Sequence, residues 1–125
     1  MKNAINWFEI PATDFDRAKK FYEEVLQAQM HTMKMEETGA QWAFFPFEME
    51  NSGIGGGIVE GQGYEPSQVG SLIYLNAGDD LSEPLSRVEK AGGKIVLPKT
   101  AIGPNGFMAH FLDTEGNKVA FHSMK

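Results

Sequence analysis

The chain contains no cysteine among its 125 residues. It can therefore form no disulfide, no thiolate-bound zinc site and no cysteine nucleophile. Only histidine, carboxylate and other oxygen donors remain as side-chain ligands for a metal ion. Several classes of enzyme and metalloprotein are thus excluded before any motif is considered.

Long apolar runs and clusters of positive charge are also absent. No apolar run approaches the roughly 20 residues that cross a bilayer, and Met1 to Ile10 lacks the basic start and apolar stretch of a signal peptide. The 11 Lys and Arg residues are scattered, and 17 acidic residues bring the formal net charge to -6. This charge pattern does not suit a phosphate backbone. We expect a cytoplasmic protein that binds neither membrane nor nucleic acid.

The first half of the chain predicts a strand, a helix and three further strands. Residues 5–10 are rich in β-branched and aromatic side chains and stop at Pro11, which cannot donate to a sheet ladder. Asp14 or Thr13 can cap a helix, because apolar side chains then recur at helical spacing as far as Leu26. Three further strands are predicted after the helix: an alternating segment at 29–35, an aromatic segment at 41–47 and a glycine-rich segment at 55–60.

The second half predicts the same order again. A strand is expected at 71–76 and a helix at 80–91, which Asp80 can cap and Gly92 can stop. Three more strands are expected at 94–97, 106–112 and 117–123. We therefore predict one α+β domain of two βαβββ modules, at about 1–62 and 69–125. Each module alone would bury too little apolar surface to be stable.

Two motifs connect this pattern to a known family. Asp14 to Tyr22 reads Asp-Phe-Asp-Arg-Ala-Lys-Lys-Phe-Tyr, and Asp113 to Asn117 reads Asp-Thr-Glu-Gly-Asn. They resemble the helix motif D-x-x-[RK]-[AS]-x-x-F-Y and the closing motif D-P-x-G-N of the vicinal oxygen chelate superfamily, which includes glyoxalases, bleomycin resistance proteins and extradiol dioxygenases. This resemblance implies a curved mixed sheet that forms a cup, with the helices outside.

The resemblance also implies four positions that hold a divalent metal ion in the enzymes of the family. Three of them fall on Trp7, on Leu72 or Ile73, and on Ala120, none of which can bind a metal. The fourth lies within 56–60, where only Glu60 could coordinate. A lone carboxylate does not make a catalytic metal site. We therefore expect neither a metal ion nor another cofactor.

Strand alternation predicts which side chains would line the cup. Trp7 shares a strand face with Glu9, Leu72 with Tyr74, and Ala120 with His122. An apolar pocket with a few polar groups is the usual composition of a small-molecule site. The predicted lining is Trp7, Glu9, Leu72, Tyr74, Ala120 and His122.

Three roles are possible for Glu9 and His122. With Glu60 they could form a relocated metal site, or as a pair they could perform metal-free acid–base chemistry. They could also be a structural hydrogen-bonded pair, or meet solvent at the mouth of the cup. We expect His31 and His110 to be structural. The aromatic residues Trp42, Phe44, Phe45 and Phe47 suit a core or a stacking surface.

Three functions follow, in decreasing order of support. The first is a metal-independent protein that encloses a small organic molecule. The second is a glyoxalase-like lyase or isomerase that uses a divalent metal at the relocated site; no catalytic residue is assigned for it. The third is an interaction module with a contact at Glu60 to Gln68. The resemblance implies that modules pair across subunits, so we expect a homodimer.

Overall fold

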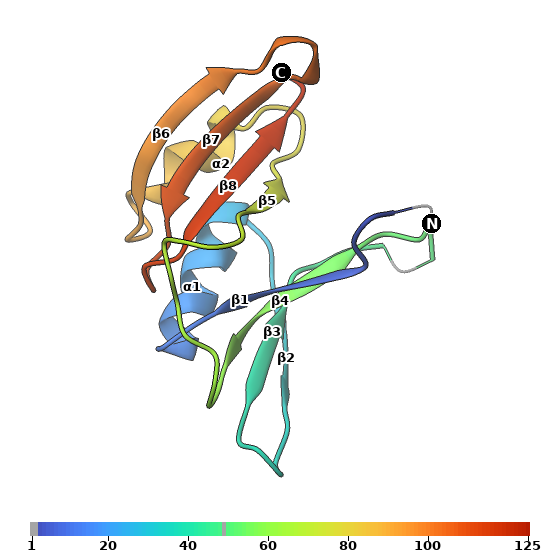
Figure 1. The fold of residues 1–125 in the computed structure, drawn as a ribbon, viewed down its shortest axis with the longest axis vertical. Helices are drawn as coiled ribbons and strands as arrows, with labels where there is room; N and C mark the ends of the chain where they lie inside the picture. Colours follow the sequence, from blue (N-terminus) through green and yellow to red (C-terminus); the bar gives the residue numbers. More distant parts are fainter. Residues whose placement is uncertain (1–2, 49) are drawn as a thin grey trace.

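The computed structural model describes residues 3–48 and 50–125, and each half of the chain forms a βαβββ module (Figure 1). The first module contains β1 (Trp7–Pro11), α1 (Phe15–Leu26), β2 (His31–Lys34), β3 (Gln41–Phe44) and β4 (Gly55–Glu60). The second contains β5 (Ile73–Asn76), α2 (Ser82–Val88), β6 (Lys94–Ala101), the short 3-10 helix η1 (Gly103–Asn105), β7 (Phe107–Leu112) and β8 (Lys118–Ser123). The predicted α+β fold is confirmed.

The strands form two separate four-stranded sheets of matching topology. The first has the order β1-β4-β3-β2 and the second the order β5-β8-β7-β6. In each sheet the first and last strands of the module pair in parallel and the other neighbours are antiparallel. Both sheets are therefore mixed, and neither closes into a barrel.

Several predicted element boundaries were wrong: β1 includes Pro11; β2, β3 and β5 are shorter than predicted; and the second helix and the strand at 94–97 also differ. The second helix covers only Ser82–Val88. Asp80, the predicted cap, lies outside it and accepts from the Ser82 N–H and from Lys99 Nζ, and residues 89–92 form turns after its other end. The strand expected at 94–97 extends to Ala101. Pro98 does not end it, because the register with β7 shifts between Leu97 and Thr100, and β6 is an edge strand.

Helix α1 lies between the two sheets and joins them in one core. The Tyr22 ring packs 5.3 Å from that of Phe45, just after β3, and the Phe21 ring lies 6.1 Å from that of Phe111 in β7. Helix α2 packs beside α1, and Arg87 Nε donates to the Val25 carbonyl at 2.8 Å. One face of each sheet and both helices thus share a single hydrophobic cluster.

The turn Asp113 to Asn117 of the second module caps the helix of the first. Glu115 Oε1 accepts from the backbone N–H of Thr13 at 2.9 Å and of Asp14 at 2.7 Å, and Glu115 Oε2 accepts from Arg17 Nε at 2.7 Å. Burial raises the pKa of Glu115, but the hydrogen bonds from Arg17, Asp14, Thr114 and Thr13 outweigh it and the net pKa is lowered. The folded state therefore favours the charged carboxylate.

A buried polar cluster completes this contact. Tyr22 donates its hydroxyl to Asp113 Oδ2 at 2.7 Å, and Asn117 Nδ2 donates to Asp113 Oδ2 at 3.0 Å and to the Pro11 carbonyl at 2.6 Å. Burial raises the pKa of Asp113 against these hydrogen bonds, and burial together with Asp113 raises that of Tyr22. Each of these polar groups is hydrogen-bonded, as burial requires.

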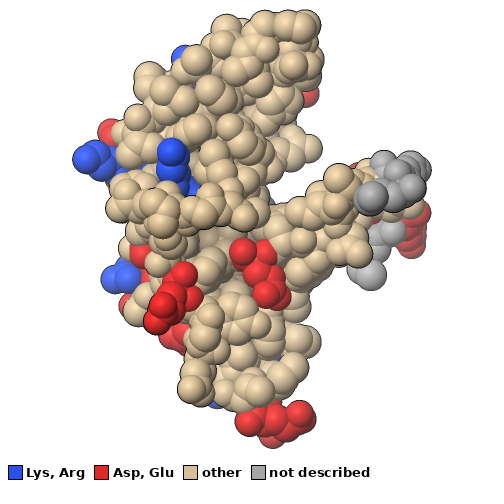
Figure 2. All heavy atoms as spheres, viewed as in Figure 1, with Lys and Arg blue, Asp and Glu red and all other residues tan. Residues whose placement is uncertain are grey.

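No helix in the described part of the chain is long and apolar enough to span a membrane. Figure 2 shows one face of the molecule, on which Lys and Arg form no continuous surface.

We predict that Glu115→Gln lowers the free energy of unfolding by about 1 to 2 kcal/mol at neutral pH, since it removes the ion pair and weakens a helix cap. Because the folded state lowers the pKa of Glu115, this stabilisation is present above its ordinary value of 4.5 and is lost as the pH falls through the folded value. Urea unfolding at several pH values measures it. Glu36→Gln, in the exposed turn after β2, is the control. An equal loss at acidic and neutral pH would contradict the assignment.

Candidate functional site

The outer face of the first sheet, turned away from the core, is rich in aromatic side chains. Side chains alternate along a strand, so Ile10 enters the core while Trp7 and Glu9 point outward. Register places the outward side chains of β2 and β3 beside them. We call this surface the tryptophan face; it consists of Trp7, Glu9, His31, Met33, Trp42 and Phe44.

Glu9 is held at the centre of the tryptophan face by two indoles. Trp42 Nε1 donates to Glu9 Oε2 at 2.8 Å, and Trp7 Nε1 donates to the same oxygen at 3.4 Å. The Trp7 ring meets those of Phe44 and Phe47 edge to face, with centroids 5.7 Å and 6.2 Å apart. Edge-to-face contacts of this kind are favourable and fix ring orientation.

The glycine run of β4 provides the close packing beneath these rings. A Cβ atom on Gly55 would lie 2.3 Å from the Phe47 ring, and one on Gly57 would lie 2.7 Å from the Ala43 carbonyl oxygen and 3.3 Å from the Phe44 ring. Glycine is therefore required here by the approach of rings and backbone. The same two positions lie opposite Trp7 and Glu9 in the neighbouring strand.

The outer face of the second sheet carries a smaller polar cluster. We call it the tyrosine face; it consists of Tyr74, Asn76, Met108, His110, Leu112, Lys118, Ala120 and His122. The Tyr74 hydroxyl lies 3.2 Å from His110 Nε2 and 3.6 Å from Met108 Sδ. Tyr74 is 47% exposed, and burial with a smaller effect of Lys118 lowers the pKa of His110. The lowered pKa of His110 favours its neutral imidazole.

The structure separates the predicted pocket lining into these two faces. Trp7 and Glu9 belong to the first, whereas Tyr74, Ala120 and His122 belong to the second. Leu72 lies just before β5 and, with Tyr74, lines a hollow of about 570 Å³. Both faces point away from the shared core, so one chain alone does not enclose the predicted cup.

Glu9 and His122 have different partners. Glu9 is bound by indoles, whereas His122 Nε2 lies 2.7 Å from the Asn105 carbonyl oxygen. Glu60 is on the opposite face of the first sheet from Glu9, and its carboxylate accepts from Gln41 Nε2 at 2.7 Å. The three side chains proposed as a relocated metal site are therefore not assembled within one chain.

Across residues 3–48 and 50–125, no group of three His, Cys, Asp or Glu side chains could hold a metal ion. The positions that the family resemblance assigns to ligands carry an indole at Trp7 and a methyl group at Ala120, with aliphatic side chains at Leu72 and Ile73. Such side chains offer no donor that suits a divalent metal. The residues present do not fit that ion.

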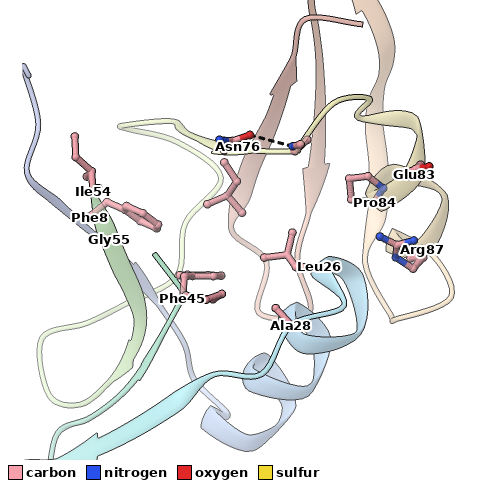
Figure 3. Close-up of a pocket in the computed structure, with 14 residues that line it drawn as sticks. Phe8, Leu26, Ala28, Phe45, Ile54, Gly55, Asn76, Glu83, Pro84 and Arg87 are labelled. Atoms are coloured by element: carbon pink, nitrogen blue, oxygen red, sulfur yellow. Dashed lines mark hydrogen bonds between the residues drawn. The ribbon is translucent and has the colours of Figure 1, made fainter. Parts of the chain in front are cut away.

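A further cleft, of about 410 Å³, lies between the modules on the helix side of the sheets (Figure 3). Phe8 and Phe45 form its wall from the first module, and Glu83, Pro84 and Arg87 lie across from them in α2. Sequence reasoning did not identify this cleft, because its lining comes from segments far apart in the chain.

The lining predicted from the sequence also lacked two residues that contact it: Trp42, which donates to Glu9, and His110, which lies beside Tyr74. No signal in the sequence could have found them, because strand pairing brings both side chains to these faces and alternation within one strand does not predict that pairing.

The chain matches the model of the Glyoxalase/Bleomycin resistance protein/Dioxygenase superfamily over residues 4–121. A glyoxylase-like domain-containing protein from Didymella fabae is 33% identical, and the match covers 93% of this chain and 90% of that protein.

Solved structures share the fold at lower identity. Glyoxalase I from Zea mays is 20% identical with a TM-score of 0.69, and the match covers 94% of this chain and 45% of that chain. This chain therefore spans less than half of the maize protein. Glyoxalase I from Leishmania major is 20% identical with a TM-score of 0.69, covering 98% of this chain and 88% of that one. The fosfomycin resistance protein FosX from Listeria monocytogenes is 14% identical with a TM-score of 0.67, covering 100% and 94%.

We predict that His110 titrates below the ordinary histidine value of 6.5, because burial and the neighbouring Lys118 disfavour the imidazolium. Following the histidine ring protons by NMR across pH 4 to 9 would measure this. Lys118→Gln should raise the midpoint by a fraction of a pH unit, since burial remains, whereas Lys20→Gln in α1 should not change it. A midpoint above the ordinary value would contradict the geometry.

Proposed function

Because the chain belongs to the glyoxalase, bleomycin resistance protein and dioxygenase superfamily, we propose that it binds a small organic molecule without a metal ion. In this proposal the molecule lies between the tryptophan face of one copy and the tyrosine face of a second copy. The observation that carries it is the division of the predicted lining between two outward faces of one chain.

Both faces have the composition of a ligand site. The tryptophan face supplies large aromatic surface with one anchored carboxylate at Glu9, and the tyrosine face supplies a hydroxyl and an imidazole from Tyr74 and His110. Small-molecule sites are mostly apolar with a few placed polar groups, and they need concave walls. Two such faces brought together would provide those walls.

Exposed apolar side chains support a second copy as the covering surface. Trp7 and Phe47 are each 37% exposed, and Met33 is 46% exposed on the same sheet. Contiguous apolar surface of this kind is typical of ligand or protein contacts. A twofold dimer would use both faces twice and would leave neither uncovered.

Three of the family's four metal positions carry side chains that cannot bind a metal, and Glu60 alone remains at the fourth, which supports a metal-free mode of binding. Trp7 would contact an apolar part of the molecule, and the polar groups beside it would orient it. Ala120 is fully buried and would support the tyrosine face from beneath, between Tyr74 and His110. Water exclusion by the rings would strengthen each polar contact. The proposal therefore assigns Trp7, Glu9, Leu72, Tyr74, Ala120 and His122 to recognition, with no catalytic step.

The first test is a titration against a broad library of small organic molecules, read by tryptophan fluorescence. We expect at least one ligand, whose affinity Tyr74→Ala weakens by about tenfold through lost aromatic contact. Tyr64→Ala, in the segment between the modules, should not change it. Treatment with a chelator should leave the affinity unaltered, and a loss of binding on chelation would contradict metal-free recognition.

The second test is the oligomeric state. Light scattering should give the mass of a dimer for the unaltered chain. Met33→Glu places a charge on the exposed apolar face and should shift the equilibrium to monomer. Val69→Glu is the matched control, because Val69 is 82% exposed but lies outside both faces. A monodisperse monomer at high protein concentration would exclude the two-copy site.

A further inference from the structure

We propose that the tryptophan face selects an organic cation, an alkylammonium or quaternary ammonium group held between the Glu9 carboxylate and the surrounding rings. This inference rests on the proposed binding of a small organic molecule at that face and names the chemical class of the molecule. It follows from the contacts of Glu9, from the arrangement of the rings and from the charges nearby.

The charge of Glu9 is not neutralised within the described part of the chain. The three ion pairs found there join Arg17 with Glu115, Lys19 with Glu23, and Lys99 with Asp80. Glu9 instead accepts hydrogen bonds from two indoles, which carry no charge, and both end on Oε2. Oε1 has no hydrogen-bond donor among residues 3–48 and 50–125 and is left for a ligand.

The two indoles also fix the position of the carboxylate relative to the aromatic surface. Each N–H points to Glu9, so each indole ring lies directly beside the negative charge. The faces of aromatic rings attract cations, and tryptophan does so most strongly. Because an indole N–H lies in the plane of its ring, the carboxylate sits at the edge of each indole. A cation bound at Oε1 would meet the full negative charge, and its substituents would extend over the neighbouring ring faces.

The neighbouring rings form an aromatic corner. The Trp7 ring is inclined by 64° to that of Phe44 and by 76° to that of Phe47, so the ring faces turn in different directions. Several aromatic walls at steep angles suit a rounded cation with apolar substituents better than a flat one. Recognition of quaternary ammonium groups uses such walls.

Among residues 3–48 and 50–125, no lysine or arginine lies on the tryptophan face. Lys34 in β2 lies opposite Gln41 and therefore points to the other side of the sheet. Lys118 shares a hollow of about 200 Å³ with Glu9 but forms no ion pair with it. The net charge of -6 further favours the approach of a cation.

The test compares choline with its neutral carbon analogue, in which a tert-butyl group replaces the trimethylammonium group, and with the corresponding anionic tert-butyl carboxylate. Shape is nearly constant across this series and charge changes. We expect choline to bind about tenfold more tightly than the neutral analogue and the anion more weakly still. Tryptophan fluorescence measures the affinities, and the two indole N–H signals in NMR spectra locate the probe.

Glu9→Gln removes the charge and keeps an oxygen that can accept the indole hydrogens. The preference for choline should then fall to about twofold or less, because the ring faces alone remain. Glu60→Gln is the matched control: it makes the same change in the same sheet, but on the opposite face, and should leave the preference unchanged. Circular dichroism checks that both variants keep the fold.

The outcomes separate this inference from the proposed function. Equal affinity for choline and its neutral analogue, or a preference that survives Glu9→Gln, overturns cation selection. If the broad library still yields a ligand that Tyr74→Ala weakens, the proposed function stands without it. If no molecule of any charge perturbs either indole, both proposals fail.

Discussion

The contact between Glu115 and the start of α1 determines how the two halves of this chain are arranged. Backbone N–H groups at a helix N-terminus have no partner within the helix. Here the N–H groups of Thr13 and Asp14, at the start of α1, are satisfied by a carboxylate from the other module, which also binds Arg17. The buried Tyr22–Asp113 hydrogen bond lies in the same contact and excludes a loose arrangement, since each group would be costly to leave unpaired.

The position of both outward faces follows from this contact. Because α1 occupies the space between the sheets, the sheet faces that meet it become core and their opposite faces remain in solvent. The stabilising groups and the proposed binding groups are thus on different surfaces of the same strands. Ile10 and Glu9, adjacent in β1, illustrate the division: one packs in the core and the other is held by indoles at the surface.

The sequence was sufficient for the fold because its signals are local. The alternation in strands, the cap at Asp14 and the glycine after the second helix each depend on a few neighbouring residues. The strand predicted at 94–97 was too short, because β6 tolerates Pro98 as an edge strand, and its place at the edge is a property of the whole sheet.

The candidate site was predictable only in part, because it depends on contacts between distant segments as well as on local alternation. Alternation correctly paired Trp7 with Glu9 and Ala120 with His122 on common faces. It could not show whether those faces meet, because that depends on contacts such as Phe21 with Phe111, which are 90 positions apart. The hydrogen bond from Trp42 to Glu9 could not be predicted either, since strand β4 lies between the strands that carry these two residues.

The glycines of β4 give the tryptophan face an unusual sensitivity to sequence divergence. A methyl group at Gly55 or Gly57 would meet an aromatic ring or a carbonyl oxygen of the adjacent strand at less than van der Waals distance. Those rings lie on the outer face of the first sheet, away from α1 and the second module, so such a replacement would displace the aromatic corner and, at Gly57, the adjoining backbone of β3. Relatives that share every strand and helix with this chain could therefore differ completely in what they recognise, through the gain or loss of a single methyl group.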